Sequence, residues 1–152
     1  MTERWQPPLA ELARRTPGDV AVDDGVRSST WGELDRRTSA IAHGLDRLAG
    51  GPGQHVALVA DNRTEFIEVA IGCLRAGLVY TPIKSTWKAN EVAQVLDDAR
   101  TTVVVTDVEG GRAAGSAGGL PVVDLDDDFD GWISRQDDGP VRLTMTATKR
   151  RL

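Results

Sequence analysis

The sequence predicts a three-layer α/β domain whose sheet is mainly parallel. Short apolar or β-branched runs at residues 55–59, 79–81 and 102–106 alternate with stretches whose apolar residues recur at helical spacing. This alternation is typical of parallel strands joined by right-handed crossover helices. The 152 residues, 40% hydrophobic and 27% charged, are enough for one domain with a real core.

The first elements are a short helix and a hairpin. Residues 8–15 have an amphipathic helical pattern, which Pro17-Gly18 ends. A short apolar run at 20–22 predicts a strand. Asp24-Gly25 is a strong hairpin turn signal, so we expect residues 26–28 to return as the second strand.

The next helix begins at a capping box, Thr30-Trp31-Gly32-Glu33. Thr30 can accept the N–H of Glu33, and the Glu33 side chain can reach back to the N–H of Thr30. The helix ends at the glycine-rich breaker at 50–53. Its apolar positions follow helical spacing: Leu34, Thr38, Ile41, Ala42, Leu45 and Leu48.

The stretch Cys73–Ile83 joins a helix to a strand. Arg75 places positive charge at the negative end of the helix, and Gly77 suits the left-handed residue that ends it. Residues 78–80 resume as a β-prone run. Pro82 is expected to end strand pairing because it has no N–H to donate.

The remaining elements complete the alternation. Asn62 is the expected N-cap of the helix 64–76, and a further helix follows Lys88. We expect 102–106 to be a buried strand and 121–124 the last strand. The helix after Lys88 has an apolar stripe of Val92, Val95, Leu96 and Ala99.

The chain divides by composition into three parts. Residues 1–106 carry the regular pattern, 107–120 are expected to form a Gly/Ala-rich mobile loop, and 121–152 are an acidic segment and tail. The loop lacks the lysine that a Walker phosphate loop needs, since Ser116 stands there.

Four stretches, in order, resemble the N-terminal part of the adenylate-forming (AMP-binding) enzymes: acyl- and aryl-CoA synthetases, peptide-synthetase adenylation domains and luciferases. They are Ser29–Leu34, Gly53–Val59, Asn62–Glu65 and Leu74–Ile83. Trp31 replaces the family's Tyr in the first, and Gln54 its Asp in the second. The resemblance covers about Leu9 to Thr106.

The resemblance implies the first part of the N-terminal domain of an enzyme most like an acyl-CoA synthetase, or fatty-acid–CoA ligase. Such enzymes convert ATP and a carboxylate into an acyl-adenylate and pyrophosphate, and a thiol such as coenzyme A then takes the acyl group. ATP, Mg²⁺ and coenzyme A are therefore the cofactors implied for the full-length family, and none is expected for this chain alone.

The family's catalytic groups are missing from the sequence. Thr144, Thr146, Thr148 and Lys149 stand where the family has its phosphate-binding loop, but the loop's glycines are absent. The adenine-binding segment, ribose-binding Asp and catalytic Lys would lie beyond Leu152. We therefore predict no catalytic, cofactor-binding or metal-binding residue, and no activity for this chain alone. Two alternatives stay open: a non-catalytic α/β binding module, and one half of a split ligase.

The acidic segment offers a rival site. Asp126–Asp137 places oxygens at calcium-loop positions one, three and five, with Gly131 at six. Against calcium, the twelfth position is Asp rather than Glu and no helices flank the loop. The alternative is an acidic loop leading into a short helix around Trp132.

Isolated reactive residues have structural interpretations. Cys73 is the only cysteine and lies in an apolar helical pattern, which favours a buried side chain over a nucleophile. His43 and His55 stand alone, so structural or exposed roles are favoured for both.

Composition and charge indicate where the protein is expected to be located and which classes of partner are disfavoured. The net charge of −5 disfavours nucleic acid, no apolar run is long enough to span a bilayer, and the N-terminus lacks a signal-peptide pattern. A single cysteine fits a reducing compartment, so we expect a cytoplasmic protein. Some side chains among Val56, Leu58, Val79, Val103 and Val105 are expected on an uncovered sheet face. This predicts self-association or a complementary chain.

Overall fold

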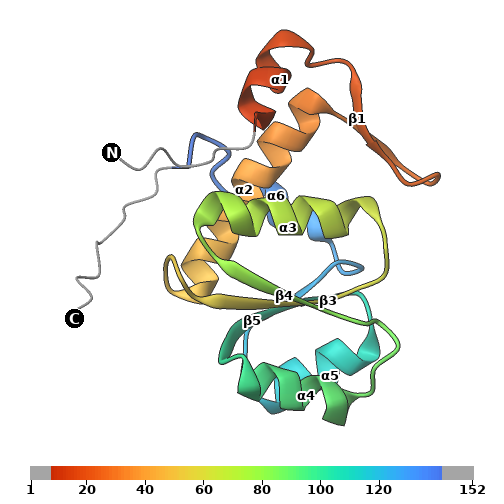
Figure 1. Ribbon diagram of the computed structural model, residues 1–152, viewed down its shortest axis with the longest axis vertical. Helices are drawn as coiled ribbons and strands as arrows, with labels where there is room; N and C mark the ends of the chain where they lie inside the picture. The colour runs from red at the N-terminus through yellow and green to blue at the C-terminus, as the bar shows by residue number, and fades with distance from the viewer. Residues whose placement is uncertain (1–7, 142–152) are drawn as a thin grey trace.

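The protein is described by a computed structural model that covers residues 8–141 (Figure 1). Its helices are α1 (Leu9–Arg15), α2 (Trp31–Ala49), α3 (Thr64–Ala76), α4 (Ala89–Asp98), α5 (Glu109–Ala117) and α6 (Phe129–Ser134). Its strands are β1 (Val20–Asp23), β2 (Ser28–Thr30), β3 (His55–Val59), β4 (Val79–Ile83), β5 (Thr101–Thr106) and β6 (Val122–Asp124).

Four strands form one parallel sheet in the order β4-β3-β5-β6. Val56 pairs with Tyr80 of β4 and with Val103 of β5, so β3 lies inside the sheet. Strands β1 and β2 form a separate antiparallel hairpin. The expected parallel pairing of β3 with β4 is confirmed.

Helices cover both faces of this sheet, which confirms the three-layer α/β prediction. Figure 1 shows α2 and α3 on one side and α4 and α5 on the other. We call these the α2–α3 face and the α4–α5 face. Because side chains alternate along a strand, Val56 and Leu58 join the core of the α2–α3 face, whereas Ala57 and Val59 join that of the α4–α5 face.

Local signals set several helix ends as expected. The hydroxyl of Thr30 accepts the N–H of Glu33 at 3.2 Å, and the Glu33 carboxylate accepts the N–H of Thr30 at 3.0 Å, so the capping box is confirmed. Gly77 has φ 71°, and the N–H of Leu78 bonds the carbonyl of Cys73 at 2.9 Å. Both helices therefore begin or end through contacts between sequence neighbours.

The expected N-cap of α3 is wrong by one residue. Arg63 holds the cap position without a side-chain hydrogen bond. The cap comes instead from the hairpin, because Asp24 Oδ2 accepts the backbone N–H of Thr64 at 2.8 Å and its hydroxyl at 2.9 Å. Asp24 Oδ1 also accepts the N–H groups of Val26 at 2.9 Å and Arg27 at 2.8 Å, so both residues belong to the turn and β2 begins at Ser28 rather than at residue 26.

Pro82 does not end its strand, contrary to expectation. It pairs with Leu58, and β4 continues to Ile83. The reason is that β4 is an edge strand among the described residues. The N–H of Val79 bonds inward to the carbonyl of Gln54, so by alternation the position of Pro82 faces outward, where no N–H is needed.

Residues 109–117 form α5, so the expected mobile loop is wrong. The glycines of this segment allow close packing. A Cβ on Gly111 would collide with the side chain of Thr106, and one on Gly115 would lie 2.6 Å from Val122 Cγ2. Small residues thus let α5 lie directly on β5 and β6.

The expectation of an uncovered sheet face is wrong for most of the side chains it named, because they lie in the core that α2 and α3 cover. Val56, Leu58, Val103 and Val105 are all 0% exposed, while Val79 on the edge strand is 46% exposed. Both faces are covered at the centre of the sheet. Self-association itself is not tested by this burial.

Candidate functional site

The carboxyl ends of β3 and β5 form the topological switch point of the sheet. The chain leaves β3 for α3 on one face and leaves β5 for α5 on the other (Figure 1). In open α/β sheets such a crevice is where ligands bind. Asp61 and Arg63 follow β3 here, Ser85 follows β4, and Asp107 follows β5.

Polar contacts fill this switch point. The N–H of Asp61 lies 3.3 Å from Asp107 Oδ1, and the hydroxyl of Ser85 donates to the Asp61 carboxylate. Arg63 Nη1 lies 3.4 Å from Asp107 Oδ2 and 2.7 Å from Asp126 Oδ1, and its Nε bonds Glu65 at 2.9 Å. These hydrogen bonds raise the pKa of Arg63, and the bond to Glu65 has the largest effect. Arg63 is thus a cation that already holds three carboxylates.

A second ionic cluster lies where the hairpin, α2, α3 and α6 meet. Glu68 of α3 is 0% exposed, and its carboxylate lies 3.0 Å from Arg27 Nη1 and accepts from Arg37 Nε. Arg37 also bonds Asp130 at 2.8 Å, and this hydrogen bond lowers the pKa of Asp130. The buried charge is compensated, as a buried carboxylate requires.

The acidic loop does not support the calcium hypothesis. Asp126 pairs with Arg63 and Asp130 with Arg37, while Asp128 accepts the N–H of Gly131 at 3.2 Å as the N-cap of α6. Between residues 8 and 141, no three His, Cys, Asp or Glu side chains are grouped so as to hold a metal ion. The structure shows the alternative, an acidic loop leading into a short helix that contains Trp132.

The isolated reactive residues have structural surroundings. Cys73 is 0% exposed, and burial raises the pKa of its thiol to about 12, which opposes thiolate chemistry near neutral pH. His43 Nε2 lies 3.0 Å from the carbonyl oxygen of Gly139, so it links α2 to the segment after α6. His55 opens β3, and its carbonyl accepts the hydroxyl of Thr102 at 3.2 Å. Thr144–Lys149 lie outside the described residues.

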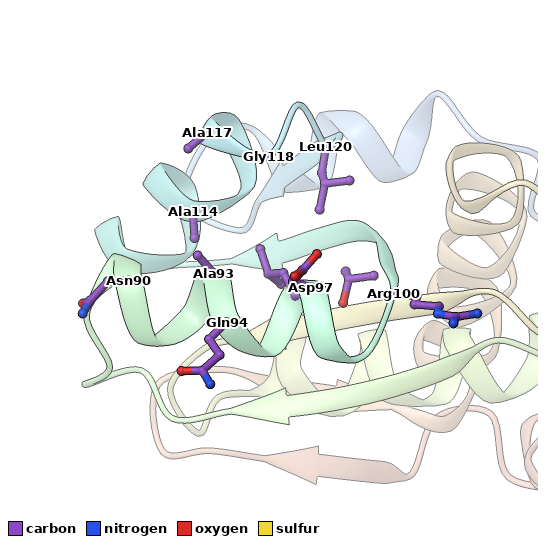
Figure 2. Close-up of a pocket in the computed structure, with 11 residues that line it drawn as sticks. Asn90, Ala93, Gln94, Asp97, Arg100, Ala114, Ala117, Gly118 and Leu120 are labelled. Atoms are coloured by element: carbon purple, nitrogen blue, oxygen red, sulfur yellow. The ribbon is translucent and has the colours of Figure 1, made fainter.

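A groove of about 660 Å³ separates α4 from α5 on the α4–α5 face (Figure 2). Small side chains at Ala93, Ala114 and Ala117 leave this space, and Leu120 lines it from the segment that follows α5. An expected loop at residues 107–120 leaves no second helix to form such a groove, so the sequence pattern does not predict it. The spacing of Ala113, Ala114 and Ala117 was the available helical signal.

Within the described residues, no helix is both long enough and apolar enough to cross a membrane.

The family model described as "AMP-binding enzyme" matches residues 9–147. The chain is 33% identical over 118 residues, 78% of its length, to the AMB antimetabolite synthetase AmbB of Pseudomonas aeruginosa, where the match covers 9% of that protein. It is 28% identical over 123 residues to the fatty acid–[acyl-carrier-protein] ligase ScoC of Streptomyces coeruleorubidus, with 79% and 24% of the two chains covered.

Among solved structures, a benzoate CoA ligase from Burkholderia xenovorans superposes with a TM-score of 0.79 at 20% identity. The match covers 90% of this chain and 29% of that one, and it shows the shared fold. The chain spans 2% of one peptide synthetase relative and 24% of ScoC. The family match extends past Thr106, where the sequence resemblance faded. The chain belongs to the AMP-binding, adenylate-forming enzyme family.

Proposed function

We propose that this chain forms the opening scaffold of the N-terminal domain of a ligase that activates a carboxylate with ATP and passes it to a thiol. The family match over residues 9–147, on a parallel sheet that carries the family's four motifs in order, is the observation that supports this function. In this proposal the carboxylate is an acyl group, and the thiol is coenzyme A or a carrier-protein thiol.

Arg63, the cation at the switch point, is held by Glu65, Asp107 and Asp126. No metal-binding group of acidic side chains is present between residues 8 and 141. A cation that is already paired with three carboxylates is a poor ligand for phosphate. We therefore propose that the 152-residue chain does not form an acyl-adenylate by itself.

Carboxylate-dependent exchange of labelled pyrophosphate into ATP tests this inactivity. The purified chain is assayed with benzoate, fatty acids and amino acids, each with Mg²⁺, against a heat-denatured control. We expect no exchange above that control. Exchange with any one carboxylate would show that the chain carries a working adenylation site.

A second assay tests the scaffold role itself. Residues 9–147 replace the matched segment of ScoC, and the chimaera is assayed for exchange with fatty acids alongside unmodified ScoC. Exchange by a folded chimaera supports an adenylation scaffold. A folded chimaera without exchange contradicts that role, and circular dichroism with a cooperative melt establishes folding. Activity that appears only when the chain and the remainder of ScoC are mixed as separate polypeptides favours a split ligase.

Location and association stay predictions. A single, buried cysteine is consistent with a reducing compartment such as the cytoplasm. Self-association is checked by light scattering of the purified chain near neutral pH. The outward position of Pro82 removes one donor from the exposed strand edge, which opposes strand-to-strand association there. A concentration-independent monomer would contradict the self-association prediction.

A further inference from the structure

An apolar stripe runs along the outer side of α3. Ile67, Ile71 and Leu74 recur at helical spacing, and Ile67 and Leu74 are 42% and 50% exposed. Exposed apolar side chains that stand singly are common on protein surfaces. Three of them on one side of one helix form a patch, and such patches mark sites where another surface packs.

This stripe lies nearly opposite the sheet. Each of its residues stands two positions before a residue of the buried core, namely Val69, Cys73 and Ala76. Two positions correspond to about 200° of rotation around a helix. A second side of α3 lies against α2, where a Cβ on Gly72 would lie only 2.5 Å from Ile41 Cγ2. The sheet and α2 therefore cover two sides of α3, and the side that carries the stripe is open.

The hairpin extends this surface at the N-terminal end of α3 (Figure 1). Asp24 accepts the N–H of Thr64, and Arg27 Nη1 lies 3.0 Å from Glu65 Oε1. Between these two contacts, Val26 at the tip of the hairpin is 97% exposed. Among the described residues no third strand pairs with β1 or β2, so the edges of this hairpin are open. The surface thus combines an apolar stripe with a strand edge.

The size of a related domain indicates what packs on this surface. The N-terminal domain of FACL13 from Mycobacterium tuberculosis superposes with a TM-score of 0.77 at 21% identity, and the match covers 90% of this chain but 37% of that one. Most of a domain with this fold is therefore additional to the part that this chain supplies. A helix with an exposed apolar stripe and a hairpin with open edges are both stabilised by a further layer of the same domain.

We propose that the α3 stripe and the hairpin form the interface that receives the remaining part of an adenylate-forming N-terminal domain. In this interface Ile67, Ile71 and Leu74 are buried against an apolar face of that part, and one of its strands pairs with the hairpin. The inference rests on the proposed scaffold function and names the partner of the scaffold. Helix α4 lies on the opposite face of the sheet and takes no part, so its exposed Ala93 provides a control position.

Thiol labelling tests whether the stripe becomes buried. Cys73 is the only cysteine and is 0% exposed, so Ile67→Cys adds an accessible thiol and labelling of Cys73 reports unfolding. The variant is treated with iodoacetamide as the isolated chain and within the ScoC chimaera, and tryptic peptides are measured by mass spectrometry. Labelling at position 67 should be at least about tenfold slower in the chimaera. Labelling of Ala93→Cys should proceed at the same rate in both proteins.

A charged substitution tests the same contact between separate polypeptides. The tagged 152-residue chain is co-expressed with the remainder of ScoC, and the two should co-purify. Leu74→Glu should reduce the recovered ScoC part at least about tenfold, because it places a carboxylate in an apolar interface. In the isolated chain the same change should shift the melting temperature by less than about 2 °C, since Leu74 is half exposed. Ala93→Glu should change neither quantity.

Several results would overturn the proposal. One is equal labelling of position 67 in the isolated chain and the chimaera, and another is equal recovery with Leu74→Glu and Ala93→Glu. Slow labelling of the isolated chain would also overturn it, because a second copy or residues 142–152 would then already cover the stripe. If the chimaera does not fold, co-purification decides, and the absence of a complex there contradicts the interface.

Failure of the interface and failure of the proposed function give different results. Protection of position 67 in a folded chimaera that shows no pyrophosphate exchange contradicts the ligase scaffold but leaves the interface standing. Exchange by a chimaera in which position 67 is labelled as fast as in the isolated chain supports the scaffold and contradicts the interface.

Discussion

The two faces of the sheet are built from the same strands but in different ways. On the α2–α3 face, large residues such as Ile41 and Leu45 are at most 1% exposed, and the buried Glu68 lies between two arginines. On the α4–α5 face, Ala57, Ala114 and Gly115 let the backbones approach each other. A groove remains between the helices there.

The helices on the two faces of the sheet therefore differ in what they contribute: one pair packs tightly, and the other leaves a groove. Large interdigitating side chains give the α2–α3 face most of its apolar stabilisation, and the two arginines offset the cost of burying the Glu68 carboxylate. Small side chains allow α4 and α5 to pack on the sheet but leave apolar surface open between them. The α2–α3 face is therefore expected to be intolerant of substitution, and the α4–α5 face to be more tolerant at the positions that line the groove.

The largest expected effect comes from the buried carboxylate. Glu68→Ala leaves Arg27 and Arg37 without their shared partner and should lower the free energy of unfolding by about 3–5 kcal/mol. Urea denaturation at pH 7 measures it. The matched control is Glu109→Ala on α5, whose side chain is 84% exposed, with a loss below about 1 kcal/mol. Equal losses at the two positions would remove the contrast between the faces.

Replacing one buried leucine on each face compares how much the two apolar cores contribute to stability. Leu45→Ala, on the α2–α3 face, should cost about 3–4 kcal/mol because it leaves an enclosed cavity. Leu96→Ala should cost about 2 kcal/mol, because Leu96 lines the groove and its removal opens toward solvent. The same urea titrations provide the comparison. A larger loss for Leu96→Ala would show that the α4–α5 face stabilises the fold more.

Two glycines sharpen the comparison within the α4–α5 face. A methyl group on Gly115 would lie 2.6 Å from Val122 Cγ2 and 3.2 Å from Val104 Cγ2, so Gly115→Ala should destabilise by about 1–3 kcal/mol. Gly118→Ala meets nothing closer than 3.4 Å and should change stability by less than about 0.5 kcal/mol. Thermal melts test this prediction: Gly115→Ala should lower the melting temperature more than Gly118→Ala does. A larger decrease for Gly118→Ala would contradict it.

The smallest effect concerns the pH dependence of the hairpin contact. Hydrogen bonds from the backbone N–H groups of Arg27, Thr64 and Val26 lower the pKa of Asp24 well below its ordinary value of 3.8. A depressed folded-state pKa contributes stability above the unfolded pKa, and this contribution is lost as the pH falls. Stability should therefore decrease between about pH 5 and about pH 2.

The variant Asp24→Asn keeps an acceptor for the N–H of Thr64 but cannot titrate. Urea midpoints measured from pH 2 to 6 at constant salt should depend less steeply on pH for this variant than for the parent chain. The same steepness in both proteins would mean that Asp24 contributes nothing to the acid sensitivity.

Local signals alone predicted much of the fold. The capping box at Thr30–Glu33 and the left-handed Gly77 act between residues a few positions apart, so the sequence contains the whole interaction. Strand and helix alternation likewise predicted the parallel sheet, because each crossover helix must return to the same sheet. The four family motifs lie on these same elements, which is why the family was also predictable from the sequence.

The sequence by itself determined the order of strands and helices, several helix ends and the family, since these depend on periodicity and on neighbours in the chain. Tertiary structure decided the remainder. By composition, Gly111 and Gly115 suggest a flexible segment, but in the fold they belong to a helix that packs closely against Thr106 and Val122. Pro82 is tolerated within a strand because that strand lies at the edge of the sheet. Asp24 caps a helix 40 residues away, and the groove exists because two separate helices expose small residues to each other. In each case the deciding partner is distant in sequence, and only the fold brings the two together.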